Sequence, residues 1–193
     1  MARATKLLHY LTTSLFTLRG ILPNITLVYH HTIPNVPGEY DFKIYGNAYY
    51  DIYGTLLDKP GGNSEPGIVL VSKDTNGNGQ PDDEWYELAG SEYNSPATIR
   101  NYEITYYRPT PADGDVKWKD NQGKEGYIYR NTYHTQGSYY PAWMPDQITF
   151  RGSRLADNSI NEPRPGMPEH WVGYCYACGY ADNHPNNTEY SQF

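Results

Sequence analysis

Two apolar runs flank an acidic, asparagine-rich segment, and this arrangement constrains the fold more than any other part of the chain. The first run, Gly67–Ser72, has the length of a strand that is buried on both faces. The second run begins at Trp85 and ends at Leu88. Apolar runs joined by a short polar segment are typical of a β-hairpin. We therefore expect residues 74–84 to form the turn between two core strands.

The same segment has the ligand pattern of a calcium loop. Oxygen-bearing side chains alternate along the chain before Gly79, which allows a sharp turn, and carboxylates resume after it. Ca²⁺ binds about six to eight oxygens at roughly 2.3–2.6 Å, so a loop that holds it must curl tightly. The expected ligands are oxygens of Asp74, Asn76, Asn78, Gln80, Asp82 and Glu84, with Gln80 acting through its carbonyl.

The match to the twelve-residue loop of helix–loop–helix calcium sensors is partial. Those loops carry a bidentate glutamate at position twelve, whereas this chain has Trp85 there and Glu84 one residue early. Pro81 also stands where those loops carry an aliphatic residue. The segment is closer to the Asp/Asn-rich calcium loops of secreted bacterial modules, in which Ca²⁺ is structural. A metal-free turn is the alternative, because Asn-Gly and Asp-rich clusters form turns without any ion.

The rest of the chain also reads as short strands. In residues 99–107, the alternation puts Tyr102, Ile104 and Tyr106 on one face. Glycine, proline and asparagine separate the strand-like segments, and helical spacing occurs only before residue 20. This pattern predicts an all-β fold, a β-sandwich or jelly roll. The further strands are expected at residues 41–45, 46–53, 99–107, 126–130, 147–152 and 171–181.

Aromatic rings supply the apolar area that such a fold needs. The chain has 193 residues, with 21 tyrosines and 4 tryptophans, and each large ring buries roughly 150–250 Å². The length suits one domain, which we place at residues 31–193. Residues 1–30 form a separate amino-terminal segment with the order of a signal peptide, since Arg3 and Lys6 precede an apolar stretch. Histidine and threonine dilute that stretch, and no small-residue cleavage site follows it.

Charge and motif content argue against several classes of function. The net charge of −7 disfavours nucleic acid, because phosphate binding needs a concentrated basic face. The chain contains no run of about 18 apolar residues, so the sequence predicts no transmembrane helix. The chain has no nucleophile elbow, phosphate-cradling glycine loop or paired-histidine zinc motif. Catalysis would need two carboxylates in one cleft, as in glycosidases. The candidates are Glu39, Glu65, Glu87, Glu103 and Asp146.

Two polar segments are candidate ligand sites. One combines aromatic and hydrogen-bonding side chains, as sites for sugars and planar ligands do. Its candidates are His134, Gln136, Tyr139, Tyr140 and Trp143. The alternative is that its rings close the core. The other segment holds Asp182 and Asn183, which suit an ion or a ligand hydroxyl, although Asx residues beside a proline form turns by default.

Cys175 and Cys178 form a C-x-x-C pair within residues 171–181. In a thioredoxin-like protein such a pair opens a helix after a strand, but this region reads as a strand throughout. Side chains three residues apart in a regular strand face opposite sides, which disfavours a disulfide. We therefore expect two small buried residues without redox or metal chemistry.

Motifs spaced along residues 30–193 form a set that matches one group of proteins. They are Thr32–Phe42, Gly46–Ala48, Ser64–Val69, Asp74–Leu88, Ile104–Pro109, Tyr139–Trp143 and Gly179–Asn183. Together they resemble secreted cell-surface proteins of Bacteroidota, including those associated with PKD domains. The resemblance implies export to the outer cell surface and capture of a ligand, and it carries over no catalytic residue. It also leads us to expect further strands after Phe193 and a different segment before residue 30.

The sequence thus predicts an extracellular, calcium-braced β-sandwich that binds a glycan or small nutrient without turnover. Other surface proteins are further expected partners. A polysaccharide hydrolase with paired carboxylates and a purely structural surface module are the alternatives.

Overall fold

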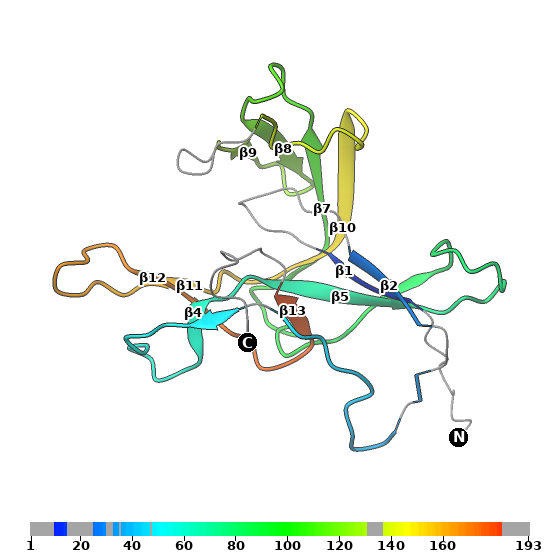
Figure 1. The fold of residues 1–193 in the computed structure, drawn as a ribbon, viewed down its shortest axis with the longest axis horizontal. Helices are drawn as coiled ribbons and strands as arrows, with labels where there is room; N and C mark the ends of the chain where they lie inside the picture. The colour runs from blue at the N-terminus through cyan, green and yellow to red at the C-terminus, as the bar shows by residue number, and fades with distance from the viewer. Residues whose placement is uncertain are drawn as a thin grey trace.

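The computed structural model describes a set of short strands and no helix. It covers residues 10–14, 25–29, 33–34, 36–46, 48–130 and 137–182, with side chains everywhere in these ranges except residues 10–14 and 25–28. The described strands form three antiparallel sheets (Figure 1). The prediction of an all-β fold is confirmed. Within the described ranges, no helix has the length and apolarity needed to cross a membrane.

The first sheet has β5 at its centre. Its strands are β1 (Tyr10–Ser14), β2 (Ile25–Val28), β5 (Pro66–Ser72), β6 (Trp85–Glu87) and β13 (Tyr180–Asp182). β1 pairs along one side of β5, while β13 and β6 pair with successive parts of its other side. Ile68, Val69 and Val71 are buried. The apolar run of the sequence is therefore a central strand, as predicted.

Helical spacing before residue 20 does not produce a helix in the described part of that region. Residues 10–14 form β1, which pairs with both β2 and β5. Thr12 and Thr13 are β-branched, and such side chains pack better on a pleated sheet than in a helix. Two strands from the amino-terminal segment thus share a sheet with β5.

The second sheet is a long ribbon of β7 and β10 that carries two shorter strands at its far end (Figure 1). The strands are β7 (Ile99–Tyr107), β8 (Val116–Asp120), β9 (Glu125–Ile128) and β10 (Gln147–Arg154), in the order β10-β7-β8-β9. Tyr102, Ile104 and Tyr106 are all buried on one face, as their alternation predicts. Tyr140 and Met144, from the segment before β10, complete this core.

The third sheet is small and brings distant parts of the chain together. Its strands are β3 (Tyr49–Tyr50), β4 (Gly61–Asn63), β11 (Ser159–Asn161) and β12 (Trp171–Tyr174), in the order β11-β12-β4-β3. Gly62 is needed for close packing, because a Cβ atom there would lie 2.2 Å from the Tyr49 carbonyl oxygen.

Three expected strands differ from the structure. Residues 41–45 form no strand, although Phe42 and Ile44 are half-buried against the core of the first sheet and their neighbours are exposed. The predicted alternation of buried and exposed side chains is therefore present, but the backbone of residues 41–45 pairs with no described strand. The strand expected at residues 46–53 is reduced to β3. The strand expected at residues 171–181 breaks after Tyr174 and resumes at Tyr180.

Candidate functional site

The Asp/Asn segment connects two paired strands, as predicted. β5 and β6 are antiparallel with Ser72 opposite Trp85, so residues 73–84 form a hairpin connection. Asp74 organises this loop, because its Oδ1 accepts a hydrogen bond from Gly77 N at 2.6 Å and its Oδ2 accepts one from Gly79 N at 3.0 Å. Both glycines have left-handed φ angles, 71° and 72°. The backbone therefore winds around the Asp74 carboxylate.

Three more of the predicted ligands face one another in the loop. Asn76 Nδ2 and Asn78 Nδ2 donate to the two carboxylate oxygens of Asp82, at 3.2 and 3.0 Å. The Oδ1 atoms of Asn76 and Asn78 accept backbone hydrogen bonds from Asn78 and Gln80, at 2.9 and 2.8 Å. Rotating an amide about its last bond exchanges its oxygen and nitrogen. Turning both amide oxygens toward Asp82, as a cation requires, would therefore replace the two backbone hydrogen bonds that they accept here.

The other acidic residues of the loop, Asp83 and Glu84, each accept a hydrogen bond from a hydroxyl group of the protein. Glu84 Oε2 accepts a hydrogen bond from the Tyr86 hydroxyl at 2.5 Å, on the β6 side of the loop. Asp83 Oδ1 accepts a bond from the Thr75 hydroxyl, while Asp83 Oδ2 is buried without a hydrogen-bond partner. A buried carboxylate oxygen is costly unless a hydrogen bond or a cation compensates it.

Carboxylates alone would not make this metal site. In the described ranges, no three His, Cys, Asp or Glu side chains gather closely enough to hold a metal ion. A cation would therefore depend on the amide oxygens of Asn76 and Asn78 and on backbone carbonyls, together with Asp74 and Asp82. Ca²⁺ accepts such a mixed set of oxygens.

The predicted aromatic ligand segment is divided by the structure. His134, Gln136 and Asn183 lie outside the described residues. Tyr140 is 1% exposed, and its hydroxyl donates to the Pro145 carbonyl oxygen at 2.5 Å. Tyr139 is half-buried against the same core, whereas Trp143 is 69% exposed. Tyr140 is therefore a core residue, which was the alternative to a ligand-binding role. Of the three described rings, Trp143 is the most accessible to a ligand.

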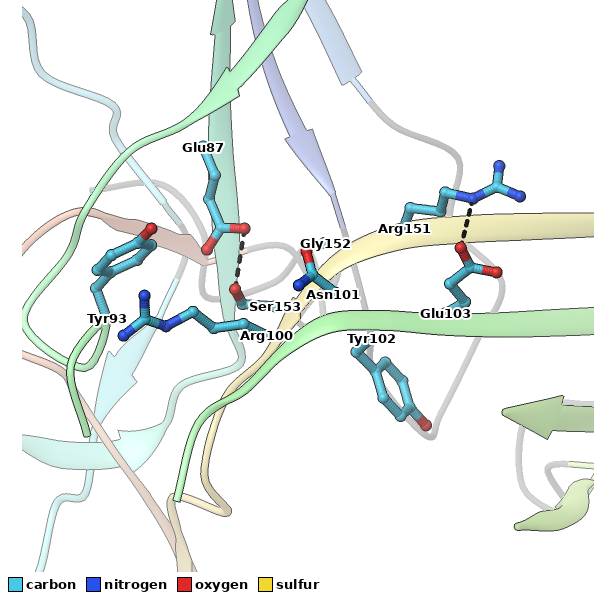
Figure 2. Close-up of a pocket in the computed structure, with 9 residues that line it drawn as sticks. All are labelled: Glu87, Tyr93, Arg100, Asn101, Tyr102, Glu103, Arg151, Gly152 and Ser153. Carbon is cyan, nitrogen blue, oxygen red and sulfur yellow. Dashed lines mark hydrogen bonds and ion pairs between the residues drawn. The ribbon is translucent and has the colours of Figure 1, made fainter. Parts of the chain in front are cut away.

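A cleft that sequence reasoning missed lies where the β7–β10 ribbon bends (Figure 2). Its volume is about 290 Å³. Asn101 has a left-handed φ of 54°, and the pairing of β10 with β7 shifts register between Gly152 and Arg154. Asparagine tolerates this region better than most residues. An asparagine and a glycine within strands are weak signals of a bend, and neither reveals that a cleft forms there.

Charged residues from three strands line this cleft (Figure 2). Ser153 Oγ on β10 donates to Glu87 Oε2 on β6 at 3.0 Å. Arg151 Nε on β10 donates to Glu103 Oε1 on β7 at 2.8 Å. These bonds fix both carboxylates against the β7–β10 ribbon. Glu87 and Glu103, two of the candidate carboxylates of the sequence, thus share one cleft.

Arg100 lies over an aromatic ring at the other end of the cleft (Figure 2). Its guanidinium carbon is 4.5 Å from the centre of the Tyr93 ring, a cation–π distance, and its Nη2 donates to Asn94 Oδ1 at 3.3 Å. A guanidinium has five N–H donors. The cleft therefore combines an aromatic ring with several hydrogen-bonding groups.

A second, smaller cleft contains Asp182. Its volume is about 200 Å³, and Cys175, Tyr176 and Tyr180 also line it. Asp182 Oδ1 accepts a hydrogen bond from the backbone N–H of Glu65 at 2.7 Å. Asp182 is therefore engaged in joining β13 to the start of β5.

A cluster of charged side chains lies buried beside the third sheet. Asp51 Oδ2 lies 3.5 Å from Arg164 Nη2, which is also 3.5 Å from Glu162 Oε2. The side chains of Asp51 and Glu162 are only 6% and 2% exposed. Burial by itself raises the pKa of Glu162, but hydrogen bonds from Tyr174 and Leu56, together with Arg164, lower it below its ordinary value. The members are far apart in the sequence, so no motif reveals them.

No protein-family model matches this chain, and no curated protein matches it. The resemblance to secreted cell-surface proteins stays a prediction. The function proposed below rests on the residues of this chain alone.

Proposed function

We propose that this protein is an exported module that captures a glycan or another small polar ligand at the outer cell surface. The observation that carries the proposal is the cleft of about 290 Å³ at the bend of the β7–β10 ribbon. Binding sites combine a concave surface with a few precisely held polar groups. In this protein, β6, β7 and β10 each contribute such groups to one cleft.

The chemistry of the lining favours a ligand rich in hydroxyl groups. Glu87 and Glu103 are acceptors, the guanidiniums of Arg100 and Arg151 are donors, and Tyr93 contributes a ring. Sugar hydroxyls donate and accept hydrogen bonds and so suit both kinds of group. The Glu87 carboxylate is held in place before a ligand arrives by its part-buried hydrogen bond from Ser153, and Glu103 pairs with Arg151 at the surface. Such preorganisation reduces the entropic cost of binding.

We propose that Ca²⁺ braces the hairpin connection at residues 73–84 and thereby supports the cleft. β6 begins directly after this loop and carries Glu87 at its end. A cation held by Asp74, Asn76, Asn78 and Asp82 would fix the start of β6 and hence the position of the Glu87 carboxylate. The convergence of the Asn76 and Asn78 side chains on the Asp82 carboxylate supports a cation in this loop. We also propose that the antiparallel sheets pack on one another as in a β-sandwich.

Titration of the purified full chain against a panel of oligosaccharides, by calorimetry, tests the ligand proposal. We expect Arg100→Ala and Arg151→Ala to weaken binding roughly tenfold each, since a hydrogen bond to a charged group contributes about 1.5 kcal/mol. Arg130→Ala is the matched control, because Arg130 is an exposed arginine that pairs with Asp113 and Asp115 outside the cleft. Equal affinities for all three variants would exclude this cleft as the ligand site.

Calcium titration of the wild type and Asp74→Ala tests the brace. We expect the wild type to gain melting temperature with Ca²⁺ and to lose the gain with a chelator, whereas Asp74→Ala should respond weakly. Asp113→Ala serves as the control, because it removes an exposed aspartate far from the loop in the sequence. A melting temperature of the wild type that is indifferent to both Ca²⁺ and chelator would contradict the proposal.

A hydrolase is the second candidate, because Glu87 and Glu103 line the same cleft. Glycosidases use two carboxylates on opposite sides of the scissile bond. Incubation with the saccharides that bind, followed by product analysis, separates the two functions. A binding module releases the saccharide intact, whereas a hydrolase cleaves it and loses that activity in both Glu87→Gln and Glu103→Gln. A purely structural module would show neither binding nor cleavage.

A further inference from the structure

The C-x-x-C pair lies in a bend and not in the strand that its sequence predicts. β12 ends at Tyr174 and β13 begins at Tyr180, so Cys175 and Cys178 lie in the connection between the third sheet and the first. The two cysteine side chains are therefore not placed on opposite faces of a regular strand. Both cysteines are also exposed, which corrects the expectation of two buried residues. Free cysteine is among the most often buried residue types, so two exposed thiols in one turn need an explanation.

Backbone contacts hold this bend at both ends. Cys175 N donates to the Pro60 carbonyl oxygen at 3.0 Å, and the Cys178 carbonyl oxygen accepts a bond from Ser91 N at 3.0 Å. Gly179 follows with a left-handed φ of 84°, and a Cβ atom there would lie 2.3 Å from Gly90 Cα. The turn that carries both thiols is therefore pressed against two other segments of the chain.

Aromatic packing fixes the same bend from inside. The rings of Tyr176 and Tyr180 meet edge to face, with centres 5.4 Å apart. The Tyr176 hydroxyl donates to the Ala156 carbonyl oxygen at 2.7 Å, and the Tyr180 hydroxyl accepts a bond from Glu92 N at 3.0 Å. Tyr176, which lies between the two cysteines in the sequence, thus points into the protein, whereas both cysteines are exposed. The bend is thus held in place by its neighbours while both cysteines remain exposed.

We propose that Cys175 and Cys178 are a reversible dithiol–disulfide pair. Both cysteines are exposed and lie outside regular strand structure, so a disulfide compound can reach them, and their separation by two residues lets the second thiol resolve a mixed disulfide on the first. The oxidant is a disulfide compound, such as oxidised glutathione. One cysteine thiolate attacks this disulfide, which forms a mixed disulfide and releases the first thiol. The other cysteine thiolate then attacks the protein sulfur of the mixed disulfide and releases the second thiol.

The overall step transfers two electrons and two protons from the cysteines to the disulfide compound. The new S–S bond closes a short ring in the connection between β12 and β13. Cys175 also lines the second cleft, together with Tyr176, Tyr180 and Asp182. Oxidation therefore alters one wall of that cleft, independently of the ligand site proposed above.

Thiol alkylation with intact mass measurement tests this pair on the full chain. The protein is equilibrated with either dithiothreitol or oxidised glutathione, and its remaining free thiols are alkylated without denaturant. We expect two alkyl groups after reduction. After oxidation we expect none, with a mass lower than that of the reduced protein by two hydrogen atoms. Adding dithiothreitol to the oxidised sample should restore both thiols.

The single variants provide the decisive comparison. In Cys175→Ser and Cys178→Ser the remaining thiol has no resolving partner, so oxidised glutathione should leave one stable glutathione adduct on each. Both positions are exposed, and a circular dichroism spectrum like that of the wild type verifies the fold of each variant. Wild-type protein that retains two glutathione adducts, keeps two alkylatable thiols, or joins into disulfide-linked dimers would overturn the proposal.

Discussion

His170 Nε2 lies 3.0 Å from Asp51 Oδ2, and this contact joins the loop after β3 to the end of the β11–β12 connection. The same Asp51 oxygen faces the guanidinium of Arg164 at 3.5 Å. Asp51 also accepts a hydrogen bond at Oδ1 from Tyr53 N at 2.7 Å. One buried carboxylate thus links two connections around the third sheet, that between β3 and β4 and that between β11 and β12.

Asp51→Ala should destabilise the protein substantially. Without this carboxylate, Arg164 would keep a largely buried charge with one acidic partner fewer, and removing one member of a buried ion pair costs roughly 3 kcal/mol. Asp113→Ala is the control, since Asp113 is exposed and lies 3.7 Å from Arg130, and exposed pairs contribute about 0–1 kcal/mol. Urea unfolding measures both variants. Similar midpoints for the two would show that the cluster is not a stabilising centre.

Acid should weaken the fold partly through Glu162. Its pKa is lower in the folded protein than its ordinary value, although burial opposes this, because Tyr174, Leu56 and Arg164 stabilise the ionised form. A depressed folded pKa means that this stabilisation is complete above the unfolded value, about 4.3, and is lost as the pH falls through the lower folded value.

Glu162→Gln removes the titrating group at this position. We expect the variant to be less stable than the wild type at neutral pH and to lose less stability between about pH 5 and pH 3. Urea unfolding at a series of pH values measures this difference. Parallel curves for the two proteins across that range would contradict it.

Tyr140 and Trp143 should behave in opposite ways. Tyr140→Phe removes the hydrogen bond to the Pro145 carbonyl oxygen inside the core, which should cost about 1 kcal/mol of unfolding free energy. Trp143→Ala should leave stability within about 0.5 kcal/mol, because that side chain is 69% exposed. Thermal unfolding compares them, and calorimetry with a bound saccharide shows whether either affects affinity. A stability loss confined to Trp143→Ala would reverse this assignment.

Gly179→Ala should cost more than Gly123→Ala. Both glycines have left-handed φ angles, 84° and 80°, so alanine is strained by the backbone at each position. Only Gly179 also meets a close neighbour, since its added Cβ would lie 2.3 Å from Gly90 Cα, whereas that of Gly123 meets no atom within 4 Å. The difference between the two unfolding free energies measures this contact. Equal losses would mean that the Gly90 segment moves aside freely.

Local patterns in the sequence predicted both a strand with one buried face and a strand buried on both faces. The alternation of Tyr102, Ile104 and Tyr106 gave the buried face of β7, and the apolar run before Asp74 gave the central strand β5. The pattern failed at residues 41–45, where Phe42 and Ile44 turn inward without a partner strand. Side-chain alternation reports burial, whereas a strand also needs a neighbouring backbone with free hydrogen-bonding groups.

The sequence by itself determined the all-β class, the hairpin around the Asp/Asn loop and the aromatic character of the core, because each follows from residues that are close along the chain. Only the tertiary structure decided the rest. It placed Glu87, Arg100 and Arg151 around one cleft, gathered Asp51, Glu162 and His170 in one buried cluster, and put the two cysteines in an exposed bend. These arrangements depend on strand pairing between segments far apart in the chain, which no local spacing encodes.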